Sequence, residues 1–330
     1  MRAAPATSGL SAIIDRYLAL KGALGRCYAN ERAVLRSLDA FLAPDAADLT
    51  PGTFARWSLT QRHLTATVRR NRMRIVRNLC LYRRRTEPAC FVPELALFPA
   101  RHQSVRPYIF TTAEIVRLLR AIRSLPLTSA APLRRETFLL AIVLLYTAGL
   151  RRGELLGLTV GDYDAVERTL QIRASKFHKS RLLPLSADGA GAIVRVLRAR
   201  RALGWPVGSD IPLLGHGVRG ARGYTGVGLG RSVRSLLQAL KIRTPDGRRP
   251  RIHDFRHTFA LHALWRWYRA GVDVQTKLPL LATYMGHVSI ASTAYYLPFI
   301  EPLAAAASRR FRQRCGMLVT ALAVARGARR

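Results

Sequence analysis

Apolar residues in the first part of the chain recur at the spacing of a helix. Between residues 11 and 42 they fall three or four positions apart, with a break at a pair of glycines, which predicts two helices. Thr50-Pro51 is typical of the start of a third helix, because threonine can cap it and proline is tolerated in its first turn. A fourth helix, rich in arginine, is expected from Thr60 to Arg84. These patterns predict a small helical domain.

The pattern changes after residue 87. The next twenty or so residues contain several prolines and no clear period, which is typical of a linker. Thr111 and Glu114 then form a capping-box signature, and an apolar helix is expected over residues 132–148. Between residues 160 and 184 two short apolar segments flank a polar tip, which predicts a β-hairpin. A glycine-rich surface loop is expected at 215–230, and further helices at 188–203, 229–240 and 252–270.

Together these patterns predict a mainly α protein with a small antiparallel β-hairpin or sheet. We expect a helical domain at residues 1–87, a linker at 88–108, a mixed α+β domain at 109–302 and a C-terminal tail at 303–330. The apolar and basic residues of the tail are compatible with a helix.

The charge of the chain indicates its partner. The 330 residues include 54 Lys and Arg against 19 Asp and Glu, which gives a net charge of +35, and 49% are hydrophobic, enough for a packed core. A genome rich in G and C would explain arginine in place of lysine, but not the excess of basic over acidic residues. A surplus of this size on a folded protein favours a polyanion, and nucleic acid is the default partner.

Other classes of protein are disfavoured. The four cysteines have no C-x-x-C spacing, so neither a zinc site nor a disulfide framework is indicated. The longest apolar run, residues 138–150, is shorter than the roughly 20 residues that span a bilayer, so no membrane is expected as a partner. No secretory signal is recognisable at the N-terminus. These features predict a cytoplasmic, nucleoid-associated protein.

Two arginines are placed where they could hold a phosphate. Arg151 follows the apolar helix and a glycine, and Glu154 lies on the same helical face, where it could orient the guanidinium. His253 and Arg256 are also three residues apart, so one helical face could present both. Arginine suits phosphate because its planar fork binds two oxygens and keeps its charge. The sequence therefore predicts phosphoryl-transfer chemistry.

His253 and His257 could alternatively bind a metal ion. His253 and His257 are four residues apart, as in a zinc-binding helix. Asp254 replaces the glutamate of H-E-x-x-H, however, and no third ligand is evident. Metal binding is the minor interpretation.

Five segments, in this order, resemble the active site of the tyrosine recombinase (phage integrase) family. The resemblance covers the chain from about residue 109 to 302, and extends more loosely over the N-terminal helices. Each segment is weak by itself, but the five together are specific. They are TAGLRRGEL from Thr147, Lys176 with RLLPL from Arg181, HDFRHTFA from His253, MGH from Met285, and TAYY from Thr293.

The resemblance implies a role for each residue. Arg151 and Arg256 would bind the scissile phosphate, Lys176 would be the general acid, and His253 and His287 would assist proton transfer and transition-state hydrogen bonding. The nucleophile of the family typically stands nine residues after the glycine-histidine, which selects Tyr296 over Tyr295. Distance from the following strand similarly favours Lys176 over Lys179. A phosphotyrosyl bond conserves the energy of the phosphodiester, so the resemblance implies no cofactor, neither metal nor nucleotide.

The resemblance also implies partners. The N-terminal helices would close a clamp on double-stranded DNA, and a homo-tetramer would assemble on paired recombination sites. The C-terminal tail would be exchanged between protomers; the alternatives are a helix that packs on its own domain and a frayed basic end. The alternatives to a site-specific recombinase are a type IB-like topoisomerase or hairpin resolvase, and a catalytically inactive DNA-binding regulator. The candidate DNA contacts on the basic helix are Arg69, Arg70, Arg72, Arg74 and Arg77.

Overall fold

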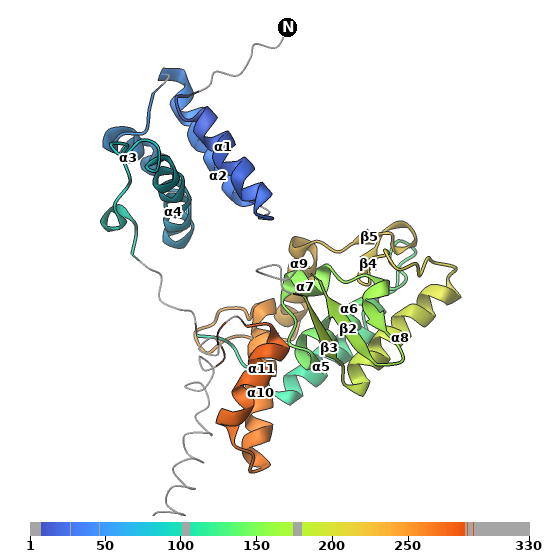
Figure 1. Cartoon of the computed structure of the whole chain (residues 1–330). Helices are drawn as coiled ribbons and strands as arrows, with labels where there is room; N and C mark the ends of the chain where they lie inside the picture. Colours follow the sequence, from blue (N-terminus) through green and yellow to red (C-terminus); the bar gives the residue numbers. More distant parts are fainter. Residues whose placement is uncertain are drawn as a thin grey trace, which may run out of the picture. The chain divides into compact units, whose positions relative to one another are not determined.

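The structure is a computed structural model of the whole chain, and it divides into two compact units, Met1–Val105 and Arg106–Arg330 (Figure 1). The residues it describes are 8–26, 28–45, 47–100, 106–173, 180–287, 289 and 293. Lys176, Lys179, both candidate nucleophiles and the predicted tail lie outside these residues. No helix in the described part is long and apolar enough to cross a membrane.

The first unit is helical, as the sequence predicts. Its core contains Ile14, Leu38, Trp57 and Val76, each buried, so every main helix contributes to one cluster. Thr50 caps the third helix in a reciprocal arrangement with Thr53, which explains why that helix starts where it does. The elements are α1 (Ser11–Ala23), α2 (Ala29–Leu42), η1 (Ala43–Asp45), α3 (Pro51–Thr60), α4 (Ala66–Arg83) and η2 (Leu95–Leu97).

Part of the expected linker packs against this first unit. Phe98 is buried in the helical core, although the sequence predicts a linker over this stretch. Arginines of α4 hold the stretch in place: Arg77 donates to the carbonyl of Pro93 at 3.0 Å, and Arg70 donates to that of Pro99 at 2.5 Å. Prolines remove amide donors but leave carbonyls as acceptors, so a proline-rich segment without a period can still be fixed by side chains.

The second unit is also mainly helical, with its core built around α6. The side chains of Phe138, Leu140, Leu144 and Leu145 are buried there, as expected of an apolar helix. Thr111 and Glu114 form the predicted capping box at the start of α5. The helices are α5 (Thr112–Arg123), α6 (Arg134–Thr147), α7 (Arg152–Leu156), η3 (Val160–Asp162), α8 (Ala187–Ala202), η4 (Val218–Gly220), α9 (Gly226–Ala239), α10 (Ile252–Arg269) and α11 (Val274–Met285).

The predicted hairpin is present within a three-stranded antiparallel sheet. Strand β2 (Thr169–Ile172) pairs with β3 (Arg181–Pro184), so that Ile172 lies opposite Arg181, and β1 (Tyr163–Asp164) pairs with the other edge of β2. Leu170, Ile172 and Leu183 bury one face of the sheet. The tip of the hairpin lies outside the described residues.

Two elements differ from the sequence-based expectation. The glycine-rich stretch includes a second small sheet, in which β4 (Gly215–His216) pairs with β5 (Arg222–Gly223), where we expected only a loop. Helix α11 is absent from the helices that the sequence predicts, and it contains Pro279. It forms nonetheless, since Leu278, Leu281 and Met285 pack in one cluster with α10. Gly286 then ends the helix in a left-handed conformation.

Candidate active site

Arg151 stands at the N-cap of α7, where the chain leaves the buried α6. Its backbone N–H donates to one carboxylate oxygen of Glu154 at 2.9 Å, and its Nη1 donates to the other at 2.6 Å. Its Nη2 donates to the carbonyl of Gly286 at 2.6 Å, which ties α7 to the end of α11. The Arg151 side chain is 24% exposed, so its fixed guanidinium still meets the surface. Glu154 thus orients Arg151, as the sequence predicts.

A second arginine binds the same carboxylate. Arg181, the first residue of β3, donates from both terminal nitrogens to Glu154, at 3.1 and 3.0 Å, and from Nε to the carbonyl of Tyr284 at 2.9 Å. The Glu154 side chain is only 4% exposed. Burial by itself would raise the pKa of Glu154, but hydrogen bonds from Arg181 and Arg151 outweigh it and lower that pKa to about 2. Glu154 is therefore a carboxylate at neutral pH, shared by two guanidinium groups.

Arg256 is the most buried of the site arginines. It lies on α10, is 1% exposed, and donates to the carbonyls of Gly149 at 2.7 Å and Met285 at 2.6 Å. Gly149 lies just before α7, and Met285 is the last residue of α11. Arg256 and Arg151 therefore bind adjacent carbonyls, those of Met285 and Gly286, from two different helices.

Gly149 allows α7 and α10 to approach each other. Its φ is +59°, and a Cβ built on it would lie 2.3 Å from the ring of Phe259 on α10. A residue other than glycine would be strained there and would push the ring away. The Gly149–Arg256 hydrogen bond depends on this close approach.

Two histidines complete the cluster. His253, one turn before Arg256, has a lowered pKa because of burial and the charge of Arg256. Burial, Arg256 and Arg151 lower the pKa of His287 to about 4. The Nδ1 of His287 is 2.7 Å from the hydroxyl of Thr293, which is fully buried. Both imidazoles are therefore neutral near pH 7, able to donate from one ring nitrogen and accept at the other.

The structure thus gathers Arg151, Glu154, His253, Arg256 and His287 into one cluster. Lys176 and Tyr296 lie outside the described residues, so their roles remain predictions. The sequence-based prediction gives no role to Arg181, although it names this residue as the start of the second strand of the hairpin. An arginine at the start of a strand that directly follows a predicted active-site loop is the signal in the sequence that could have revealed it.

No metal centre is formed by the part of the chain that the structure describes, since no three His, Cys, Asp or Glu side chains gather there. His253 and His257 instead pack edge to face, with ring centroids 4.7 Å apart.

The arginines of α4 that are predicted to contact DNA differ in whether their side chains are bound within the first unit or exposed. Arg70 and Arg77 bind the carbonyls described above, and Arg72 donates to Gln61. Arg69 is partly buried, whereas Arg74 is exposed. Of the five arginines, Arg74 therefore has the side chain best placed to meet a partner.

Comparison with known proteins identifies the family. Residues 109–298 match the model of the phage integrase family, which is more than half of the chain. The chain belongs to the phage integrase family. It is 32% identical, over 91% of its length and 96% of the relative's, to a putative integrase/recombinase, y4rB, of Sinorhizobium fredii. It is 30% identical to the tyrosine recombinase XerC of Mycobacterium tuberculosis, over 86% of this chain and 91% of XerC.

Solved structures of integrases share its fold. The Tn1549 transposon integrase, solved in complex with transposon right end DNA, superimposes with a TM-score of 0.62 at 18% identity, covering 91% of this chain and 98% of the integrase. A lambda integrase dimer bound to a core site gives 0.56 at 18% identity, covering 88% and 77%. The predicted fold class and family are therefore confirmed, and this integrase-family chain is a site-specific recombinase of the tyrosine type, a DNA strand transferase.

Proposed function

We propose that this recombinase cleaves and rejoins double-stranded DNA through a 3′-phosphotyrosine link to Tyr296. The observation that carries the proposal is the convergence of Arg151, Arg256, His253 and His287 from α7, α10 and the loop after α11, with Arg151 held by a buried carboxylate. Fixed cations and neutral donors, held before substrate arrives, are what a phosphorane transition state requires.

In the proposed reaction the Tyr296 hydroxyl loses its proton and attacks the scissile phosphorus. The bond from phosphorus to the 5′ oxygen breaks, and Lys176 gives that oxygen a proton as it leaves. Arg151 and Arg256 stabilise the negative charge on the non-bridging oxygens. Rejoining reverses each step with a 5′ hydroxyl of either strand as the attacking group. The phosphodiester energy is kept in the covalent link, so the reaction needs neither a nucleotide nor another cofactor.

The histidines act in neutral form in this scheme. Their lowered pKa values favour that form, because the surrounding guanidinium groups oppose a further positive charge. If the Thr293 hydroxyl donates to Nδ1 of His287, the proton of the imidazole resides on Nε2. His287 would then donate a hydrogen bond to a phosphate oxygen. His253 is the candidate acceptor for the tyrosine proton.

The N-terminal unit is proposed to bind the phosphate backbone of the DNA. Its support is the basic helix α4, on which Arg74 is exposed, together with the charge of the whole chain. Such contacts set affinity and register without reading sequence. The relatives named integrase favour a role in moving a mobile element.

We further propose that the recombinase works as a homo-tetramer on paired sites, coupled by its C-terminal tail. The second unit has an apolar cavity of about 530 Å³ whose lining includes Phe259, Ala263, Trp267, Leu280 and Leu281. Leu280 is 60% exposed there. The tail carries apolar residues of matching kind, among them Leu303, Phe311, Leu318 and Leu322. A tail from one protomer that fills this cavity on another would link their active sites.

A covalent-adduct assay tests the central proposal. The protein is incubated with nicked duplexes from the DNA that flanks its gene, and adducts are separated on a denaturing gel. Tyr296→Phe should abolish the adduct, and Tyr295→Phe, the matched control, should retain it, because two adjacent side chains point in different directions and only one of them can face the phosphate. Adducts formed by Tyr296→Phe but not by Tyr295→Phe would show that the other tyrosine is the nucleophile.

A further inference from the structure

Three consecutive carbonyls at the end of α11 are each bound by a different arginine. The N–H groups of Gly286 and His287 close the helix on earlier carbonyls, which leaves these three acceptors without a partner in the helix. The negative end of the helix dipole also favours cations at this position. The hydrogen bonds are between 2.6 and 2.9 Å long, and they join Arg181 to Tyr284, Arg256 to Met285 and Arg151 to Gly286.

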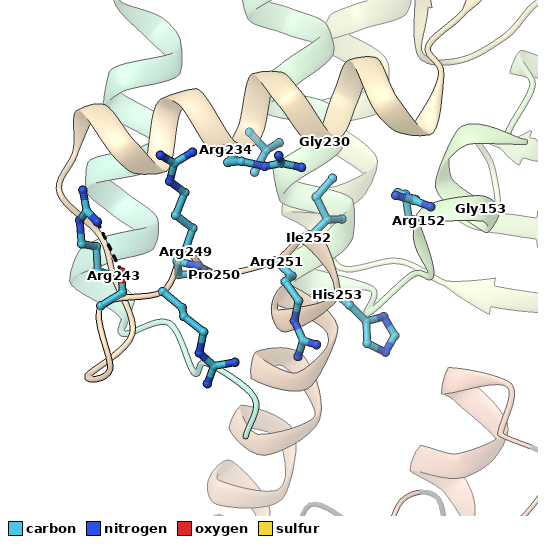
Figure 2. A pocket seen from close by; sticks show the side chains of 13 residues that line it. Arg152, Gly153, Gly230, Arg234, Arg243, Arg249, Pro250, Arg251, Ile252 and His253 are labelled. Atoms are coloured by element: carbon cyan, nitrogen blue, oxygen red, sulfur yellow. Dashed lines mark hydrogen bonds between the residues drawn. The ribbon is translucent and has the colours of Figure 1, made fainter. Parts of the chain in front are cut away.

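Arg181 is the one of these arginines to which the proposed reaction gives no role. Its Nε donates to the Tyr284 carbonyl, and its two terminal nitrogens donate to the two carboxylate oxygens of Glu154, so each of its nitrogens binds a group of the protein. It does not line the arginine-rich pocket beside the site, which Figure 2 shows with Arg152 and His253 on its wall. The contacts of Arg181 are therefore with the groups that hold the site.

The charge of Arg181 matters to Arg151. Glu154 is a buried carboxylate that binds both guanidinium groups. A carboxylate paired with Arg151 alone would cancel its charge, whereas two guanidinium groups around one carboxylate keep a net charge of +1. Arg181 thus allows Glu154 to orient Arg151 and still leaves a positive charge for an anion.

Arg181 also joins strand β3 to the end of α11. It is the first residue of β3, and at the other end of that strand the Tyr284 hydroxyl donates to the carbonyl of Pro184 at 2.9 Å. A Cβ built on Gly286 would lie 2.7 Å from Nη1 of Arg181, so glycine is needed there for the guanidinium to fit. Arg181 therefore links α7, β3 and α11 through one side chain.

We propose that Arg181 is a positioning residue for strand cleavage, which holds Glu154 and the end of α11 together and through them fixes Arg151 and His287. The inference rests on the proposed function, because cleavage is the step that it serves. Arg181 itself touches none of the reacting atoms. Lysine cannot replace it, because an ammonium group lacks the planar fork that binds both carboxylate oxygens while Nε binds a carbonyl.

Single-turnover adduct formation tests this role. The full-length protein is used in excess over the nicked duplex, and the rate constant at saturation, the half-saturating concentration and the final yield are measured separately. Arg181→Lys should lower the rate constant by about 10²-fold, as expected when catalytic groups are misplaced by about 1 Å. The half-saturating concentration and the yield should not change, because the variant keeps the charge. A purely structural role would instead lower the yield, through unfolded protein, and leave the rate constant as in the parent.

Arg173→Lys is the matched control. Arg173 also binds a buried carboxylate, that of Asp162, at 2.6 Å, and it follows Ile172, which pairs with Arg181 in the sheet. Within the described residues, no hydrogen bond or ion pair joins it to Glu154 or to α11. This variant should keep the parent rate constant. Equal slowing by the two variants would overturn the proposal, as would a parent rate constant for Arg181→Lys.

A second measurement does not depend on cleavage. In nitrogen NMR spectra, a guanidinium group that is held gives separate signals for its two terminal nitrogens, and one that rotates freely gives an averaged signal. Arg151, assigned by the loss of its signals in Arg151→Lys, should give separate signals in the parent protein and an averaged signal in Arg181→Lys. Unchanged signals would refute the positioning role. A parent protein that forms no adduct would refute the proposed function, and the spectra would still decide whether Arg181 fixes Arg151.

Discussion

Glu154→Gln is the sharpest test of how the site is held together. The parent carboxylate is almost fully buried and accepts hydrogen bonds from Arg151 and Arg181. Glutamine keeps the shape but loses the charge, and its amide group would direct N–H donors at one of the guanidinium groups. Breaking a buried ion pair by removing one partner costs about 3–5 kcal/mol. The pKa of Glu154, about 2 in the fold against its ordinary 4.5, corresponds independently to about 3 kcal/mol at neutral pH.

We therefore expect Glu154→Gln to lose about 3 kcal/mol of unfolding free energy at pH 7. Because folding lowers the pKa of Glu154, its contribution is complete above pH 4.5 and disappears as the pH falls through about 2. The difference between parent and variant should thus stay constant above about pH 5 and narrow below it. Urea unfolding followed by circular dichroism, repeated at pH values from neutral to about 3, measures this difference.

Glu114→Gln is the matched control for this change. Glu114 is also the third residue of a helix with a capping box, where its carboxylate accepts from the backbone and hydroxyl of Thr111, but no salt bridge is formed with it in the described residues. Its replacement should cost about 1 kcal/mol. Adduct formation should fall for Glu154→Gln and persist for Glu114→Gln. If both variants lose the same stability, or if the Glu154→Gln difference does not narrow in acid, the carboxylate does not hold the site as we infer.

Three further predictions concern single features of the chain. Lys176→Ala should slow cleavage by about 10²–10⁴-fold, and sulfur in place of the bridging 5′ oxygen should restore it, because a thiolate leaves without a proton; rescue of Lys179→Ala instead would identify that lysine as the general acid. A chain that ends at Ser308 should still form adducts on single sites but recombine two sites poorly in a plasmid assay, and undiminished recombination would reject tail exchange. Gly149→Ala should lower the free energy of unfolding by more than about 2 kcal/mol through strain at positive φ and the clash with Phe259, whereas Gly191→Ala, in a helix with only ordinary contacts, should be neutral or stabilising in the same urea titration.

The sequence by itself determined the elements whose cause is local. Helical periodicity, the Thr111 capping box and the change of period at the hairpin all depend on residues close together in the chain, and each appears in the structure as expected. The pairing of Arg151 with Glu154 could also be predicted, because three residues separate them on one helical face. Family motifs supplied the remaining site residues, since the chemistry dictates residue type and order.

Only the tertiary structure decided the contacts that join distant segments. Arg181 binds the Glu154 carboxylate although the two residues are far apart in the sequence, so no helical or strand periodicity could predict the contact. Arg256 binds carbonyls whose positions depend on where α6 and α11 end. Helix α11 forms despite Pro279 because burial against α10 outweighs the lost hydrogen bond. The tertiary structure also decided which arginine side chains are bound within the protein and which are exposed. Packing turns Arg70 and Arg77 toward carbonyls within their own unit and leaves Arg234 and Arg249 exposed beside the active site, a difference that depends on neighbours in space, not in sequence.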